Sequence, residues 1–177
     1  TQVLGALVRA VSGRSLADFM AEYLVEPLGF ENPGYWCTDA LGVEMAYAGL
    51  NIVARDYARL GECYRNGGRF NGVQVVPEDW VRESTRVDSP VRAPGRIGAN
   101  GEEAGLGYGY QWWIPEGEDC EFMAIGVLNQ FIYVNPSAGV TIVKLSANRM
   151  YGTAASEETN RGGETLAFFR ALCRSGD

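Results

Sequence analysis

The sequence predicts an α+β fold in which a helical segment is followed by antiparallel strands and a C-terminal helix. Two patterns carry this prediction. Apolar residues recur at helical spacing in the first half of the chain, whereas β-branched and aromatic residues concentrate between turn signals in the second. A stretch rich in glycine and proline separates the two halves. We therefore expect a helical segment over residues 1–86, a loop over 87–106, and strands with a closing helix over 107–177.

Size and charge narrow the class of protein. A chain of 177 residues, 46% of them hydrophobic, is long enough to build one sizeable core. The net charge of −7, without a run of like charges, argues against nucleic acid or an anionic membrane as partner. No stretch reaches about 18 consecutive apolar residues. We expect a soluble protein; this chain carries no targeting signal, and its compartment is not indicated.

The rare residue types exclude several kinds of site. Histidine is absent and Lys144 is the only lysine, so a Ser-His-Asp triad or a histidine-ligated metal is excluded within this chain. The cysteines have no CxxC spacing, which leaves neither a zinc site nor a redox pair; two disulfides can be drawn, but the chain length favours four buried thiols. We expect no metal and no cofactor. The cysteines are Cys37, Cys63, Cys120 and Cys173.

The helical pattern of the first predicted helix is already under way at the first residues of the sequence. The stretch TQVLGALVRAVSG starts inside a helical pattern, with no start methionine or signal peptide before it, which indicates a cut chain. A second helix begins at a capping box formed by Ser15 and Asp18, and its apolar stripe stops before Pro27 and Gly29. The residues on one face of the first helix are Val3, Leu4, Leu7, Val8 and Val11.

Two more helices precede the loop. Asn51 is a candidate N-cap of the first, which Gly67 and Gly68 would end. The second is expected from Pro77 to Thr85, because proline fits the first turn of a helix.

The second half predicts an antiparallel meander and a helix packed on it. The strands are expected where β-branched and aromatic residues lie between turn signals, and the helix where apolar residues return to helical spacing. The expected strands are Tyr108–Ile114, Glu121–Ile125, Gln130–Asn135 and Val140–Leu145, and the expected helix is Glu164–Cys173.

Four blocks of sequence, in this order, resemble a known family. They are TQVLGALVRAVSGRSLADFMAEYLVEPLGF, AGLNIVARDYARLGECYRNGGRFNGVQVVPEDWV, GYGYQWWI and MAIGVLNQFIYVNPSAGVTIVKLS. Together they resemble serine hydrolases of the β-lactamase-related superfamily, above all the class C-like esterases and the 6-aminohexanoate-dimer hydrolases. The resemblance covers nearly the whole chain, and the order of the blocks is more specific than any one of them.

The resemblance implies a β-lactamase/transpeptidase-like fold of about twice this length. The family's nucleophilic serine and its lysine lie in an SxxK motif, and its tyrosine lies in a YxN-like motif shortly before the segment that starts at Thr1. All three would then lie upstream, and this chain would be the C-terminal half of such an enzyme. A serine hydroxyl needs a nearby base to act as a nucleophile, so the chain alone is expected to contain no catalytic residue.

Substitutes within the chain are interpreted as structural. Thr141 and Lys144 have the TxxK spacing, but in a strand they face opposite sides. The tripeptides at Tyr64 and Tyr133 spell YxN, one at the end of a helix and the other at the end of a strand.

The family's oxyanion motif falls on a stretch that departs from its pattern. In relatives this motif is KTG or HxG, and its backbone lines the oxyanion hole. The stretch has no charged side chain, which weakens a penicillin-type interpretation, yet a backbone N–H of Val127 or a neighbour can still stabilise an oxyanion. The alternative is that Gly126 only permits a bulge in a core strand. The proposed wall consists of Gly126, Val127, Leu128, Asn129 and Gln130.

Asn51 is the second candidate site residue. It corresponds to a segment near the active-site mouth of similar enzymes, and an N-cap explains it equally well.

Three functions remain open. The chain is part of a serine hydrolase that acts on a small ester or amide once its N-terminal half is present, an inactive relative that uses the cleft for binding, or a stand-alone interaction domain. The apolar wall favours the second, and exposed sheet edges or helix faces would favour the third.

Overall fold

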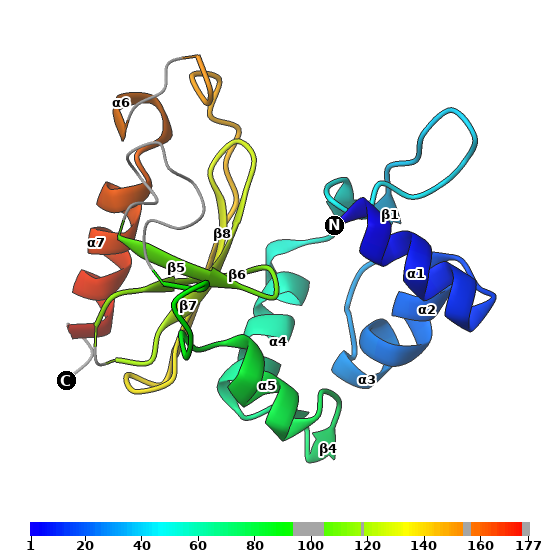
Figure 1. Ribbon diagram of the computed structural model, residues 1–177, viewed down its shortest axis with the longest axis horizontal. Coiled ribbons are helices and arrows are strands. Elements are labelled where there is room, and N and C mark those ends of the chain that lie inside the picture. The colour runs from blue at the N-terminus through cyan, green and yellow to red at the C-terminus, as the bar shows by residue number, and fades with distance from the viewer. Residues whose placement is uncertain (94–104, 118, 154–156, 175–177) are drawn as a thin grey trace.

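A five-stranded antiparallel sheet forms the centre of the protein (Figure 1). The computed structural model describes residues 1–93, 105–117, 119–153 and 157–174, so most of the predicted loop lies outside the described residues. The strands follow one another as a meander, as the sequence predicts. They are β5 (Leu106–Gly109), β6 (Trp112–Pro115), β7 (Phe122–Gly126), β8 (Gln130–Asn135) and β9 (Val140–Lys144).

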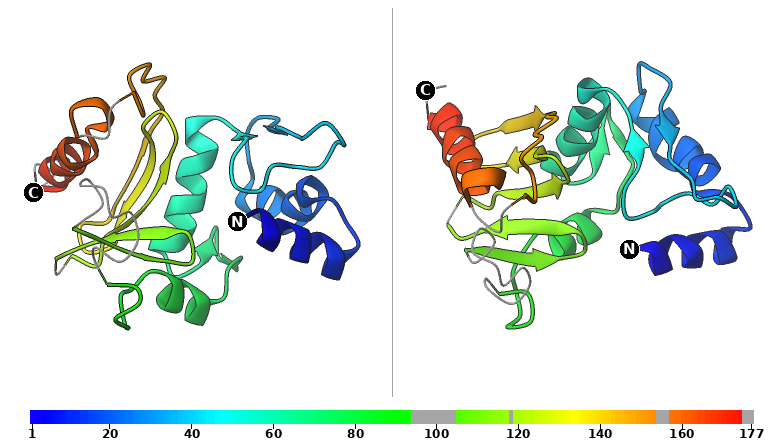
Figure 2. Two further views of the ribbon diagram at one scale, coloured as in Figure 1. Left: turned by 45° about the horizontal axis from the view of Figure 1, so that its top comes forward. Right: turned by 90° about the horizontal axis from the view of Figure 1, so that it is seen from above.

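One helix covers each face of this sheet (Figure 2). Helix α7 (Gly162–Arg174) packs on the face that carries Met123, Phe131 and Tyr133. Helix α4 (Ala54–Arg65) packs on the other face. Because side chains alternate along a strand, each strand supplies both layers of the core. The buried residues on the α4 side are Trp112, Ile114, Phe122, Ile132 and Val134.

The predicted strand over residues 108–114 is wrong as a single strand. Tyr110 and Gln111 adopt left-handed backbone conformations with φ of 51° and 74°, and they form the turn between β5 and β6. Neither residue is a glycine or asparagine, the types that ordinarily mark such a turn. The stretch therefore folds into a hairpin that the composition does not signal.

The second predicted helix is longer than expected. The hydroxyl of Ser15 accepts a hydrogen bond from the N–H of Asp18 at 3.0 Å, which confirms the cap of α2 (Leu16–Met20). The helix then continues through Pro27 by way of a π-helical turn, η1 (Ala21–Val25), into α3 (Glu26–Leu28). Proline lacks an N–H, and the wider turn relaxes the usual pairing before it. Gly29, with φ of 61°, ends the helix.

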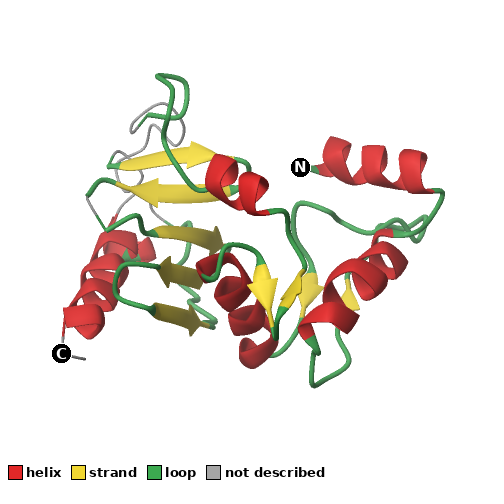
Figure 3. Cartoon of the chain, turned by 90° about the horizontal axis from the view of Figure 1, so that it is seen from below, coloured by secondary structure: helices red, strands yellow, loops and turns green. Residues whose placement is uncertain are grey.

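Two short hairpins flank α4, and a further helix follows them. Figure 3 shows helices on both sides of the strands of the large sheet. Helix α5 lies within one residue of its predicted bounds at each end. The elements are β1 (Tyr35–Trp36) paired with β2 (Leu50–Asn51), β3 (Arg69–Phe70) paired with β4 (Val73–Gln74), and α5 (Glu78–Ser84).

Helix α1 (Gln2–Ser12) exposes most of its apolar face. It meets the rest of the chain through Gly5, the only buried residue of this helix, which lies against Ala46 and Leu16. The predicted stripe is thus formed but largely uncovered, which is unusual for so many apolar side chains in a row. The exposed fractions are 81% for Val3, 52% for Leu4, 57% for Leu7 and 80% for Val11.

The cysteines differ from expectation in their burial. No disulfide joins them. Cys63 is buried, Cys173 is half-buried, and Cys37 and Cys120 are exposed, so the prediction of four buried thiols is wrong for two of them. Burial raises the pKa of the Cys63 thiol to about 11, which keeps it protonated at neutral pH.

Candidate active site

The turn between β7 and β8 ends the sheet on one side. Gly126 pairs with Gln130, and three residues, Val127, Leu128 and Asn129, close the hairpin. The pairing from Phe122 to Gly126 is one-to-one, so the alternative of a bulge at Gly126 is wrong. Val127 and Leu128 are 58% and 42% exposed, and they put apolar side chains at the surface of the turn.

The backbone of this turn is strained. Leu128 and Asn129 have φ of 64° and 66°, in the left-handed region that costs about 1–2 kcal/mol for ordinary residues. Asparagine tolerates this conformation better than most residues. A branched leucine does not tolerate it so well, and strain of this kind concentrates at functional sites.

Contacts from the last residue of β9 and from the chain that follows it hold the turn. The carbonyl of Leu128 accepts a hydrogen bond from the N–H of Asn148 at 3.4 Å. The carbonyl of Asn129 accepts one from Nζ of Lys144 at 3.3 Å. The side-chain amide of Asn129, which is only 5% exposed, donates to the carbonyl of Asn160 at the end of α6 (Glu157–Asn160). Asn129 is therefore an anchor, and not only a wall residue.

Gln130 fixes the first residue of β8 in the same way. Its side-chain amide donates to the carbonyl of Ser146 at 2.6 Å and accepts from the N–H of Ser146 at 3.1 Å. This two-sided pair occupies both polar ends of the glutamine, so Gln130 acts on the chain after β9.

The outer edge of β7 is open next to the turn. Among the described residues, β6 pairs with β7 only at Trp113 and Met123. Beyond that point, no strand in the described part of the chain pairs with the outer side of β7, from Ala124 to Gly126. No backbone hydrogen bond outside the strand ladders, between described residues, uses the N–H of Val127, Leu128 or Asn129. Among the described residues, these three N–H groups therefore have no backbone acceptor outside the ladders.

The N-terminus and the β5–β6 turn lie at this end of the sheet. Because β6 runs antiparallel to β7, the turn at Tyr110 and Gln111 lies toward the end of β7 that carries Gly126. The hydroxyl of Thr1 donates to Oε1 of Gln111 at 2.8 Å. Thr1 is thus tied to the end of the sheet that carries the proposed wall.

Asn51 lies in β2, and its predicted role as an N-cap is wrong. Val53 occupies the N-cap position of α4 and makes no side-chain cap. The Asn51 amide instead donates to the carbonyl of Gly49 at 2.7 Å and lies 3.7 Å from Sγ of Cys37. These bonds hold the loop before α4, and the candidate role near a substrate stays a prediction.

Helix α4 points its N-terminal end toward the proposed wall. Its C-terminal part lies near the opposite turn, since Arg65 is close to Gly139 and Gly61 packs against Thr141. The start of α4, which follows Asn51, is accordingly at the end of the sheet that carries the β7–β8 turn (Figure 1).

The candidate substitutes for a catalytic pair are separated by the sheet. Thr141 faces α4 and donates to Glu62 at 3.3 Å, whereas Lys144 faces the α7 side with Nζ 5.1 Å from the centre of the Phe131 ring. Burial, and secondarily Arg161, lower the pKa of Lys144. The two residues do not form a nucleophile and base.

Neither YxN tyrosine is poised as a base. Tyr133 is fully buried and hydrogen-bonds Glu121 and Asn135, and burial and the Glu121 carboxylate raise its pKa. Tyr64 packs with its ring centre 4.9 Å from that of Trp112, and burial raises its pKa also. Both tyrosines stay protonated near neutral pH, as expected of core residues.

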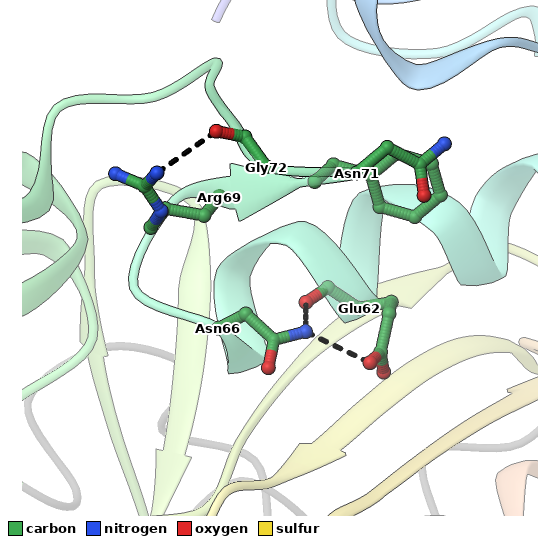
Figure 4. Close-up of a pocket in the computed structure, with 6 residues that line it drawn as sticks. Glu62, Asn66, Arg69, Asn71 and Gly72 are labelled. Atoms are coloured by element: carbon green, nitrogen blue, oxygen red, sulfur yellow. Dashed lines mark hydrogen bonds between the residues drawn. The ribbon is translucent and has the colours of Figure 1, made fainter.

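One pocket between described residues lies away from this end. Figure 4 shows its lining residues at the C-terminal end of α4. Its volume is about 470 Å³. Asn66 there hydrogen-bonds the backbone and side chain of Glu62, and Arg69 donates to the carbonyl of Gly72. The polar groups of this pocket thus satisfy one another. Its lining residues are Glu62, Asn66, Arg69, Phe70, Asn71 and Gly72.

Two general features concern ligands and membranes. In the part of the chain that the structure describes, no three side chains of histidine, cysteine, aspartate or glutamate come together in a way that could bind a metal ion. Over the same residues, every helix is too short or too polar to cross a membrane.

Comparisons of the sequence and of the structure with known proteins find relatives of the same kind. The family model for β-lactamase matches residues 1–165. The chain is 30% identical over 147 residues to a 6-aminohexanoate-dimer hydrolase of Paenarthrobacter ureafaciens, covering 83% of this chain and 37% of that protein. A solved structure from Bacillus anthracis, described as a 6-aminohexanoate-dimer hydrolase, superposes with a TM-score of 0.82 at 31% identity and covers 97% of this chain and 41% of its own.

A more distant structure shares the fold alone. It comes from Bacteroides dorei, is described as a β-lactamase, and has a TM-score of 0.59 at 18% identity, covering 94% of this chain and 55% of its own. The chain therefore spans about two fifths of the length of the nearer relatives and about half of this one.

Proposed function

Since the chain belongs to the β-lactamase family of hydrolases, we propose that it forms the C-terminal part of a serine hydrolase that cleaves esters or amides through an acyl-enzyme. The observation that carries this proposal is the open edge of β7 beside a strained turn whose N–H groups are outside the ladders. Such donors suit the negative charge that develops on a carbonyl oxygen during acyl transfer.

The nucleophile would come from outside this chain. Lys144 is its only lysine, and it faces away from Thr141, the residue at SxxK spacing. A serine and its base would lie in the segment that precedes this one in the relatives. Thr1 supports that arrangement, since it is tied to the end of the sheet that carries the proposed wall and residues before it would start there.

In the proposed reaction this chain stabilises charge. The serine oxygen attacks the carbonyl carbon of the substrate and passes its proton to the base, and the leaving group departs with a proton. Water then releases the acyl group by the same route. In both steps the carbonyl oxygen becomes negative, and an N–H from Val127, Leu128 or Asn129 would donate to it.

The wall favours an uncharged substrate. Val127 and Leu128 expose apolar side chains, and no cationic side chain belongs to the wall itself. A group such as a β-lactam carboxylate would lack a partner on this strand, whereas a neutral ester or a linear amide would not need one. The relatives named as 6-aminohexanoate-dimer hydrolases make a linear amide the first substrate to test, and the charged ends of such a dimer would need partners outside this strand.

A second candidate is an inactive relative that binds a ligand in the same place. The apolar Val127 and Leu128 favour it, because they could contact a ligand without taking part in chemistry. The exposed apolar face of α1 indicates that a further segment or a partner covers it. This feature is equally compatible with a hydrolase and with a binding module.

One experiment decides between hydrolase and binding module. A protein that contains this chain and the segment preceding it in the relatives is treated with a fluorophosphonate, which labels activated serines, and its intact mass is measured. The hydrolase gains one adduct, whereas the 177-residue chain alone gains none. A complete protein that stays unlabelled while binding an amide ligand would make the binding module the correct function.

A further inference from the structure

The register of β8 and β9 places Lys144 next to the proposed wall. Lys144 pairs with Phe131, one residue after Gln130, so the end of β9 lies beside the start of β8. The Lys144 ammonium lies over the Phe131 ring, 5.1 Å from its centre, and donates to the carbonyl of Asn129 at 3.3 Å. A strand residue far along the chain thereby binds the last peptide of the turn.

The contacts fix the direction of two successive peptide units. In a trans peptide the C=O of one residue and the N–H of the next point in opposite directions. The Leu128 carbonyl is held by Asn148 and the Asn129 carbonyl by Lys144. The N–H of Asn129 must therefore point away from Asn148, and the N–H of Gln130 away from Lys144.

Loss of the lysine would free one of these units. If the peptide after Asn129 rotated, its carbonyl would leave the Lys144 side and turn toward the opposite side of the turn. A carbonyl oxygen there would repel the negative charge that the wall is proposed to stabilise. The neighbouring conformations at Leu128 and Asn129, both left-handed, would also lose a restraint.

We propose that Lys144 is a positioning residue, which orients the 127–129 turn through the Asn129 carbonyl. This role rests on the proposed function, because the peptide that Lys144 orients directly follows the residues whose N–H groups are assigned to the carbonyl oxygen of the substrate. Lys144 does not touch the substrate. Its charge matters because a charged donor binds a carbonyl more strongly than a neutral one.

Three variants test the role in the protein that contains this chain and the preceding segment. Lys144→Met keeps an unbranched side chain and removes the donor. Lys144→Arg restores a charged donor. Thr141→Val is the matched control, since it changes a polar residue of the same strand on the other face. Kinetics on an amide substrate, thermal stability and crystal structures are compared for each.

The expected result separates positioning from stability. Lys144→Met should lower kcat about tenfold to a hundredfold with KM changed less than about twofold, because the donors are displaced rather than removed. Lys144→Arg should recover most of kcat, and Thr141→Val should keep it. The crystal structure of Lys144→Met should show the Asn129 carbonyl turned. If Lys144→Met does not fold, Lys144→Gln replaces it with a shorter neutral donor.

Failure of this role differs from failure of the proposed function. If the complete protein is active and Lys144→Met keeps both kcat and the orientation of the Asn129 carbonyl, the positioning role is wrong. If the complete protein takes no fluorophosphonate, the proposed hydrolase is wrong, and the structure of Lys144→Met alone decides whether Lys144 orients the turn.

Discussion

The side-chain amide of Asn129 donates a hydrogen bond to the main-chain carbonyl of Asn160, so the turn after β7 is fastened to the end of α6. The same asparagine has a left-handed backbone and is almost completely buried. A surface hairpin is thus fixed by a distant segment. This is the arrangement expected where a turn must hold its backbone groups in one direction.

A substitution that relieves the backbone strain at Leu128 should stabilise the folded protein. Replacing Leu128 by glycine removes the left-handed penalty at φ of 64°, so Leu128→Gly should raise the free energy of unfolding by about 0.5–1 kcal/mol. Val127→Gly is the control, and should lower it by a similar amount because only entropy is lost. Urea unfolding of both variants checks this. A loss of stability in Leu128→Gly would mean that the strain is not real.

Substitution of the buried ion pair between Glu121 and Arg170 should destabilise the protein strongly. Glu121 is 2% exposed, forms an ion pair with Arg170 on α7 and accepts a hydrogen bond from Tyr133. Glu121→Ala leaves the arginine and the phenol without their shared partner, and should cost about 3–5 kcal/mol. Arg82→Ala, which breaks an exposed pair with Asp79, should cost less than about 1 kcal/mol. Equal losses in thermal unfolding would contradict this ranking.

The carboxylate of Glu62 should contribute stability that acid removes. A hydrogen bond from Arg65 is the main cause that lowers the pKa of Glu62 below its ordinary 4.5, and Asn66 and Thr141 add to it. Because the folded-state pKa is lowered, the contribution is present above about pH 4.5 and is lost as pH falls through the folded value. Glu62→Gln should therefore be less stable than the unmodified protein at pH 7.

The same comparison in acid gives the control for Glu62. The difference between Glu62→Gln and the unmodified protein, measured by urea unfolding, should shrink toward zero as the pH falls below the folded-state pKa of Glu62, because both side chains are then uncharged. A difference that is constant from pH 7 to pH 2 would assign the effect to packing and not to charge.

Substitutions on the exposed apolar face of α1 test whether a further segment packs against it. Leu4→Ser with Leu7→Ser should leave the stability of the 177-residue chain nearly unchanged, since both residues are more than half exposed. In a protein that includes the preceding segment, the same pair should destabilise. Leu28→Ala, at a fully buried position, should cost about 2–5 kcal/mol in both. If the serine pair has the same small effect in both proteins, nothing covers this face.

Local signals in the sequence were sufficient for most of the sheet and the helices. The capping box at Ser15 and the proline at Pro77 each mark a helix start within one residue. The meander follows from apolar stretches that turn signals separate, such as the turn before Gly139. Signals of this kind depend on neighbours in the chain, and so a single sequence carries them.

What escaped prediction depends on distant contacts. The turn at Tyr110 and Gln111 has no glycine at either position, and residues far away in the sequence, such as Thr1, contact it in the folded protein. Asn51 is of a residue type that is common at helix N-caps, yet its pairing with Tyr35 places it in a strand. The anchors at Asn129 and Lys144 join residues 15 to 31 positions apart, so no local spacing reveals them.

The measurement that tests the central claim most directly is a crystal structure of the complete protein after reaction with a fluorophosphonate. The phosphoryl oxygen of the adduct stands where the carbonyl oxygen of a substrate becomes negative. The proposed function predicts that this oxygen lies about 2.7–3.1 Å from the backbone nitrogen of Val127, Leu128 or Asn129. An adduct whose oxygen binds other groups, with the 127–129 turn out of reach, would contradict the role of this turn as the oxyanion wall.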